Sequence, residues 1–241
     1  MVTKNQIKLV TSLQQKKYRN QHGLFVVEGL KTVMEVLDSG IEPFGIYVDN
    51  ESYRDRLDDS TILVGPSVLA QMSGQSNPSG ILGVFHMPKM ITPTLKGWTL
   101  ALDAIRDPGN LGTIIRLCDW FDIKDLICSK DTVDCYNPKV LQATMGSIAR
   151  VNISYVDLAE FFEKNPNAPI LGTFMDGDSL YEQSFPKNGI LVMGNESNGI
   201  SDVIQKKVSH RIGIPQFGSQ TTESLNVASA TAILLSEIRR G

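Results

Sequence analysis

Apolar residues in the second half of the chain form short continuous runs, and longer stretches with helical spacing separate these runs. Continuous apolar runs are typical of strands that are buried on both faces of a parallel sheet. The pattern predicts strands at residues 98–102, 125–128, 170–174, 190–193 and 211–214. It predicts helices at residues 111–121, 139–144, 156–164, 201–207 and 225–239. This alternation indicates an α/β domain built on a parallel sheet.

The first part of the chain alternates shorter helical and strand patterns. They predict helices at residues 7–13, 30–37 and 66–72, and strands at residues 24–27, 45–48, 62–64 and 81–85. Residues 87–97 then hold the chain breakers Pro88, Pro93 and Gly97 without any periodicity, which is typical of a linker. The sequence therefore predicts a small N-terminal α/β domain at residues 1–92 and a second α/β domain at residues 93–241.

The composition is ordinary for a globular protein. The chain has 241 residues, of which 41% are hydrophobic and 20% are charged, and it is long enough to bury a real core. The sequence contains no run of 18 apolar residues, so no membrane helix is predicted. Residues 1–6 lack the apolar core of a secretory signal. The three cysteines form no CxxC pair, and their odd number fits a reducing compartment. We expect a cytoplasmic protein without a membrane partner.

The charge distribution bears on nucleic-acid binding. A net charge of −3 argues against a protein that coats nucleic acid without regard to sequence. A local basic patch is nevertheless sufficient for a specific RNA enzyme. The first 31 residues contain one acidic residue, Glu28, against the basic residues Lys4, Lys8, Lys16, Lys17, Arg19 and Lys31. These residues form either an RNA-binding patch or simply a solvated helix face.

A first polar segment follows the strand predicted at residues 98–102. Pro108, Gly109 and Asn110 break the chain there, and the Asn110 side chain either caps the next helix or faces a ligand. Arg116 lies within that helix and is flanked by apolar residues. It either faces solvent or contacts a phosphate or a 2′-hydroxyl group, for which its permanent charge and forked shape are suited.

Two further polar segments follow later strands. Residues 194–199 form a turn bounded by glycines, which allow positive φ and close approach of a ligand to the backbone. Ser224 precedes a helix rich in small residues and is either its N-cap or a ligand contact. No GxGxxG fingerprint occurs, and the three histidines lack metal-ligand spacing, so we expect neither a dinucleotide site nor a metal.

These three segments, in this order, resemble the signature motifs of the SpoU (TrmH) family of RNA 2′-O-methyltransferases, within the SPOUT superfamily. The resemblance covers about residues 98–241. Residues 18–29 and 77–81 are similar to a small substrate-binding domain that resembles a ribosomal RNA-binding protein. The family implies a parallel-sheet domain threaded as a deep trefoil knot, S-adenosylmethionine as methyl donor, and a homodimer with the site near the dimer interface.

The resemblance also implies roles for particular residues. It assigns the catalytic site to Asn110, Arg116, Glu196, Ser224 and Asn226. It assigns contacts with the methyl donor to Thr173, Gly194, Ile214 and Leu225. Two features depart from the family pattern, because the loop at residues 215–223 is longer than the commonest one and Ser197 stands where a glycine often follows the glutamate.

The expected activity is methyl transfer from S-adenosylmethionine to a ribose 2′-hydroxyl group of RNA, with large-subunit (23S-type) ribosomal RNA as the first expectation. Two alternatives stay open, a transfer RNA 2′-O-methyltransferase and a non-catalytic RNA-binding or assembly factor with the same fold. Strand–helix alternation alone also suggests a nucleotide-dependent oxidoreductase. That enzyme class requires GxGxxG and an acidic residue about 20 positions later, and the chain lacks this combination.

Overall fold

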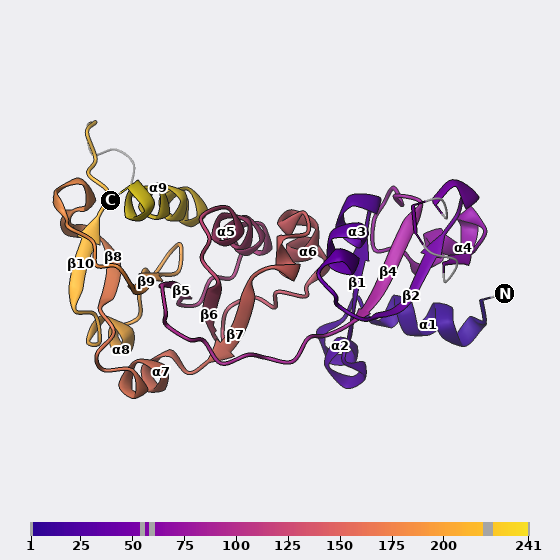
Figure 1. Cartoon of the computed structure of the whole chain (residues 1–241), viewed down its shortest axis with the longest axis horizontal. Coiled ribbons are helices and arrows are strands. Elements are labelled where there is room, and N and C mark those ends of the chain that lie inside the picture. The colour runs from indigo at the N-terminus through magenta and orange to yellow at the C-terminus, as the bar shows by residue number, and fades with distance from the viewer. Residues whose placement is uncertain (1, 54–55, 58–60, 219–223, 241) are drawn as a thin grey trace. The chain divides into compact units, whose positions relative to one another are not determined.

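Two sheets organise the chain in the computed structural model, which describes residues 2–53, 56–57, 61–218 and 224–240 (Figure 1). One sheet belongs to a unit formed by residues 1–89 together with 134–150, and the other to a unit formed by residues 90–133 and 151–241. The segment 134–150, predicted within the second domain, therefore packs with the first unit. The domain boundary near residue 93 stays a prediction.

The first unit is built on a four-stranded sheet in the order β1-β4-β2-β3. Its strands are β1 (Leu24–Glu28), β2 (Pro43–Val48), β3 (Ile62–Leu63) and β4 (Ile81–His86). Its α-helices are α1 (Lys4–Ser12), α2 (Lys16–His22), α3 (Leu30–Asp38), α4 (Pro66–Met72) and α6 (Pro138–Thr144). Two short 3₁₀ helices are η1 (Glu51–Tyr53) and η2 (Ser147–Ala149). Strand β4 runs antiparallel to both of its neighbours, and β3 runs parallel to β2.

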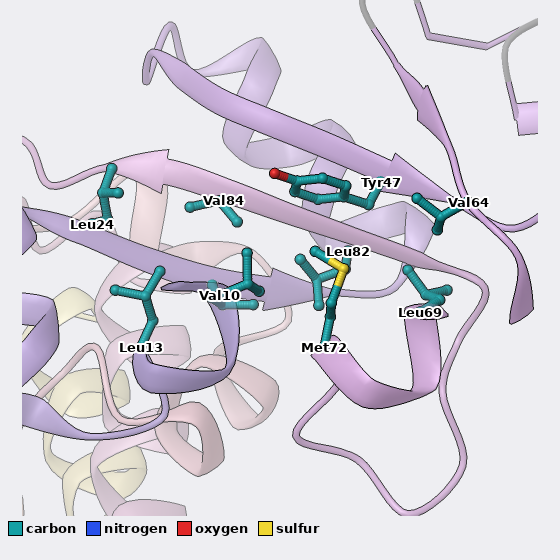
Figure 2. Packing of buried hydrophobic residues seen from close by; sticks show 10 residues of the cluster. Val10, Leu13, Leu24, Tyr47, Val64, Leu69, Met72, Leu82 and Val84 are labelled. Atoms are coloured by element: carbon teal, nitrogen blue, oxygen red, sulfur yellow. The ribbon is translucent and has the colours of Figure 1, made fainter. Parts of the chain in front are cut away.

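Both faces of this sheet are buried, which explains the continuous apolar runs in β1 and β4. On one face, Val10 of α1, Leu13 at the C-cap of that helix and Met72 of α4 pack against the strands (Figure 2). On the other face, the Phe25 ring contacts the ring of Tyr136, with centroids 4.7 Å apart. Burial of large apolar side chains on both faces supplies the main stabilising term for the unit.

Arg19 ties the segment 134–150 to the N-terminal residues. Its side chain is buried and donates from Nη2 to Oδ2 of Asp134 at 2.5 Å. The other terminal nitrogen donates to the carbonyl groups of Leu13 and Gln14, both at 2.9 Å. Arg19 is therefore a structural residue of the first unit and does not belong to an exposed basic patch.

The second unit is built on a six-stranded sheet in the order β10-β8-β9-β5-β6-β7, with every neighbouring pair parallel. Its strands are β5 (Trp98–Leu102), β6 (Asp125–Ser129), β7 (Asn152–Val156), β8 (Ile170–Ser179), β9 (Gly189–Met193) and β10 (His210–Gly213). Its helices are α5 (Pro108–Trp120), α7 (Leu158–Lys164), η3 (Leu180–Glu182), α8 (Asp202–Gln205) and α9 (Val227–Arg240). The predicted α/β fold with a C-terminal parallel sheet is confirmed.

Helices cover both faces of the parallel sheet. In Figure 1, α5 and α9 lie together on one face, while α7 and α8 lie on the other. The strand order reverses between β5 and β9, which are neighbours in the sheet although the chain forms β6, β7 and β8 between them. In sheets of this type, ligands bind beyond the carboxyl ends of the strands at the point of reversal. The loops that follow β5 and β9 are therefore the expected place for a ligand.

Several elements differ from the sequence predictions for local reasons. Helix α1 begins at Lys4 because Thr3 and Gln6 form a reciprocal capping box. Helix α2 was not predicted, since its sequence carries no apolar stripe. Strand β7 was missed because polar residues alternate along it, as suits the edge of the sheet. Within the described ranges, no helix has the length and apolar character needed to cross a membrane. The trefoil knot stays a prediction.

Candidate active site

The three polar segments lie at the carboxyl ends of neighbouring parallel strands. The first follows β5, the second follows β9, and the third follows β10 and leads into α9. Because parallel strands end at the same edge of the sheet, residues that are far apart in the sequence meet there. The expected convergence of the three segments therefore has a simple topological cause.

Asp107, rather than Asn110, caps helix α5, which begins within the first segment. Oδ1 of Asp107 accepts a hydrogen bond from the backbone N–H of Asn110 at 2.8 Å, and Pro108 occupies the first helical turn, where its missing N–H costs nothing. The alternative interpretation of Asn110 as a helix cap is therefore wrong. Its side-chain amide is left available for other partners.

A chain of side-chain hydrogen bonds, which we call the amide relay, joins Asn226, Asn110 and Glu196. The Asn110 Nδ2 group donates to Oε1 of Glu196 at 2.8 Å, and Asn226 Nδ2 donates to Oδ1 of Asn110 at 2.9 Å. A carboxylate can only accept, so it fixes which end of the Asn110 amide faces it. The relay thus links residues from all three segments in one defined orientation.

The turn of the second segment has very little room. A Cβ atom on Gly194 would lie 2.3 Å from the carbonyl carbon of Gly199, so only glycine fits at position 194. The backbone N–H and C=O groups of Asn195 pair with those of Gly199, both at 2.9 Å. The turn is also tied to the first segment, because Asn195 Nδ2 donates to the carbonyl of Ala104 at 2.8 Å.

A buried aspartate adds a second tie between these two segments. Asp103 comes directly after β5, and its Oδ2 accepts from the backbone N–H of Ser201 at 2.7 Å. Neither Asp103 nor Asn195 was assigned a role from the sequence. The sequence does show an acidic residue at the end of an apolar strand. Such a residue, when buried, needs a hydrogen-bond donor as partner.

Asn226 has two functions in the third segment. Its Oδ1 accepts from the backbone N–H groups of Ala228 at 2.9 Å and Ser229 at 3.2 Å, which caps α9. Its Nδ2 group belongs to the amide relay. The N-cap of α9 is therefore Asn226 and not Ser224, whose exposed side chain lies at the wall of a cavity.

That cavity has a volume of about 610 Å³ and is lined by loops of the parallel sheet. Its lining includes all four residues expected to contact a methyl donor, namely Thr173, Gly194, Ile214 and Leu225. Glu196 and Ser224 also line it. The volume lies within the range of small-molecule sites. In the part of the chain that the structure describes, no cluster of three His, Cys, Asp or Glu side chains could hold a metal ion.

Arg116 does not belong to the lining of the cavity, and it takes no part in the hydrogen bonds of the amide relay. It is exposed on α5, and no ion pair to it is found among the described residues. Thr113 and Trp120 are also exposed, at positions that share a helix face with Arg116. Its guanidinium group is therefore available to a partner from outside this unit.

Residues 97–236 match the SpoU rRNA methylase family over more than half of the chain. The chain belongs to the SpoU rRNA methylase family. Residues 4–83 match a second family, described as an MRM3-like substrate-binding domain. The resemblance inferred from the three motifs is thus confirmed, and so is the similarity of the N-terminal region to a substrate-binding domain.

Relatives and solved structures are similar to this protein along nearly the whole chain. The protein is 31% identical to 23S rRNA (guanosine(2553)-2′-O)-methyltransferase RlmP of Bacillus subtilis, over 98% of this chain and 97% of the relative. A TrmH-family structure from Porphyromonas gingivalis has a TM-score of 0.92 and 37% identity, covering 100% and 99% of the two chains. The AdoMet-bound rRNA methyltransferase from Sinorhizobium meliloti has a TM-score of 0.87 and 29% identity, covering 100% and 96%.

Proposed function

We propose that the protein transfers a methyl group from S-adenosylmethionine to a ribose 2′-hydroxyl group of ribosomal RNA of the large subunit. The observation that carries this proposal is the amide relay through Asn226, Asn110 and Glu196 at the edge of a cavity of about 610 Å³. Membership of the SpoU family and the named activity of RlmP support both the reaction and the choice of RNA. Transfer RNA is the alternative substrate.

The cavity suits S-adenosylmethionine in size and in its mixture of lining groups. Thr173, Gly194, Ile214 and Leu225 would hold the donor between apolar side chains and loop backbone. Bound there, S-adenosylmethionine supplies an electrophilic methyl group to the nearby ribose. The Thr173 hydroxyl donates to the carbonyl of Val192 at 3.0 Å, which fixes one wall of the site to β9.

The chain's own residues have to make a weak nucleophile reactive. A ribose hydroxyl group needs either removal of its proton or stabilisation of the charge that develops on its oxygen. A guanidinium group stays protonated in proteins, so Arg116 orients the 2′-oxygen and stabilises its charge rather than acting as a base. The proton passes to water or to a phosphate oxygen of the RNA. Asn110 positions the ribose or Arg116, while Glu196, Ser224 and Asn226 hold the surrounding loops.

The N-terminal region recognises the RNA in this proposal. Its match to a substrate-binding domain supports the assignment, and five of its lysines are exposed: Lys4, Lys8, Lys16, Lys17 and Lys31. Exposed cations of this kind attract the phosphate backbone. Cys118, Cys128 and Cys135 are buried and form no disulfide among the described residues, which supports a reducing compartment such as the cytoplasm.

A homodimer completes the proposal, with Trp120 of α5 in the interface. The Trp120 side chain is 83% exposed and lies one turn after Arg116. Exposed tryptophans often supply much of the binding energy at protein interfaces. Trp120→Glu is expected to shift the protein from dimer to monomer in sedimentation equilibrium. A variant that stays fully dimeric would exclude this face, and Val203→Glu, at an exposed site on α8, is the matched control.

The reaction is tested by tritium transfer from labelled S-adenosylmethionine to RNA from cells that lack the gene. We expect label in large-subunit RNA, mapped to a ribose, and its loss with Arg116→Ala. Label in transfer RNA would establish the alternative substrate. No label in any RNA or ribosomal particle, despite confirmed donor binding, would favour a non-catalytic assembly factor.

A further inference from the structure

Strand β8 leaves its pairing with β10 beside the cavity. Gly172 pairs with Arg211, whereas the next residue of β10, Ile212, pairs with Asp178. Residues 173–177 therefore lie outside the register, and we call them the β8 excursion. Thr173, Phe174 and Met175 of the excursion line the cavity, so its conformation determines the shape of one wall.

Arg211 contacts the β8 excursion at two places. Its guanidinium carbon lies 3.5 Å from the centroid of the Phe174 ring, and its Nη2 group donates to Oδ1 of Asp176 at 2.6 Å. This ion pair lowers the pKa of the Asp176 carboxyl group. A planar guanidinium group can stack on a ring and bind a carboxylate at once, which a lysine ammonium group cannot do.

The backbones of the excursion and of β10 are in direct contact. A Cβ atom on Gly177 would lie 2.4 Å from the carbonyl carbon of Ile212, and one on Gly213 would lie 2.7 Å from the carbonyl oxygen of Phe174. No side chain separates the two segments at these points. A small displacement of Phe174 or Asp176 therefore alters the cavity wall directly.

We propose that Arg211 is a positioning residue for the methyl-donor site, because its contacts with Phe174 and Asp176 hold the β8 excursion in the shape that the donor requires. The inference rests on the proposed function, since it assumes that the cavity binds S-adenosylmethionine. Arg211 itself does not belong to the lining, so it acts through Phe174 and Asp176. Its side chain is 44% exposed, so we expect its removal to cost little stability.

Calorimetric titration with S-adenosylhomocysteine, the demethylated donor, measures this role without catalysis. We expect Arg211→Ala and Phe174→Leu each to raise the dissociation constant about tenfold, as loss of a stacked cation and reordering of a binding wall predict. Arg211→Lys keeps an ion pair with Asp176 but loses the planar stacking, so it should fall between wild type and Arg211→Ala. Asp176→Asn tests the other contact in the same way.

The matched control is Lys207→Ala, which removes an ion pair between Lys207 and Glu163 (2.7 Å) elsewhere in the same unit. It should bind S-adenosylhomocysteine like the wild type. In steady-state kinetics, Arg211→Ala should raise KM for the donor and leave KM for RNA unchanged. General destabilisation of the fold would instead affect both KM values.

The results of these titrations distinguish the role of Arg211 from the proposed donor site itself. A wild-type protein that does not bind S-adenosylhomocysteine refutes the proposed donor site and, with it, the role of Arg211. A wild-type protein that binds, with Arg211→Ala binding equally well, refutes the role of Arg211 alone. If Arg211→Ala melts below the assay temperature, Asp176→Asn gives the same decision, because Asp176 contacts Arg211 and does not line the cavity.

Discussion

Two arginines, one in each unit, show how differently the same side chain is used. Arg19 in the first unit is 2% exposed and donates to Asp134 and to two carbonyl groups. Arg116 in the second unit is exposed on α5, and no ion pair to it occurs in the described ranges. From the sequence, both were candidates for contact with RNA. Burial and partners, rather than residue type, assign the first to the fold and leave the second exposed, as the proposed contact with RNA requires.

The same contrast extends to the other polar groups of the two units. In the first unit, Glu28 accepts from the Ser73 hydroxyl and from the backbone N–H of Gly74, which holds a loop to β1. In the second unit, the amide relay places polar groups along the edge of a cavity. Parallel strands concentrate loop residues at one edge, so the second unit can present them to a ligand.

The largest effect is expected from Arg19→Ala, which would leave Asp134 without its cationic partner. Removing one member of a buried ion pair costs about 3–5 kcal/mol, because the remaining charge stays desolvated. Urea unfolding should show this loss in the free energy of unfolding. Lys16→Ala, at an exposed site on the same helix, is the control and should change it by less than about 0.5 kcal/mol. A cost of under about 1 kcal/mol for Arg19→Ala would contradict its structural role.

Arg116→Ala should show the reverse behaviour, with a large loss of activity and no loss of stability. Removing a group that stabilises developing negative charge lowers kcat by about 10²–10³-fold, equivalent to about 2.7–4 kcal/mol. Arg116→Lys should lose most of the activity as well, since an ammonium group lacks the forked geometry. Donor binding should be unchanged in both. Full activity in Arg116→Lys would refute the role, and Arg240→Ala, at an exposed site on α9, is the control.

The sequence predicted those features of the fold that leave a local pattern, and it did not predict those that depend on contacts between distant residues. Continuous apolar runs identified β1 and β4, because burial on both faces leaves a local pattern. Strand β7 was missed because an edge strand carries polar residues. The packing of residues 134–150 with the first unit depends on contacts such as that between Arg19 and Asp134, which no local pattern encodes.

In the candidate site, too, the contacts between residues far apart in the sequence could not be predicted. The motifs named Asn110, Glu196 and Asn226 through their resemblance to a family, yet the hydrogen bonds between them were not predictable. These bonds span 86 and 116 residues and exist only because β5, β9 and β10 end at one edge of the sheet. The role of Arg211 depends on the register shift between β8 and β10, and a single sequence does not reveal register.

The amide relay can be broken with a smaller, more selective change. Asn226→Asp keeps an acceptor for the backbone of α9 but cannot donate to Asn110, so capping and relay are separated. We expect kcat/KM to fall about tenfold, equivalent to about 1.4 kcal/mol, with the unfolding free energy unchanged. In a double-mutant cycle with Asn110→Ala, the two losses should not add, because both variants break the same relay. Strict additivity would show that the relay has no functional role.

The smallest effects compare the two helix caps, Thr3 of α1 and Asp107 of α5. Each side chain accepts a hydrogen bond from a backbone N–H group of its helix, so Thr3→Ala and Asp107→Ala should each cost about 1 kcal/mol in urea unfolding. Only Asp107→Ala should also lower kcat at saturating substrate, because the first turn of α5 carries Asn110. Asp107→Asn keeps an acceptor and should restore both quantities. Equal kcat values for Thr3→Ala and Asp107→Ala would mean that the start of α5 is as remote from the chemistry as α1.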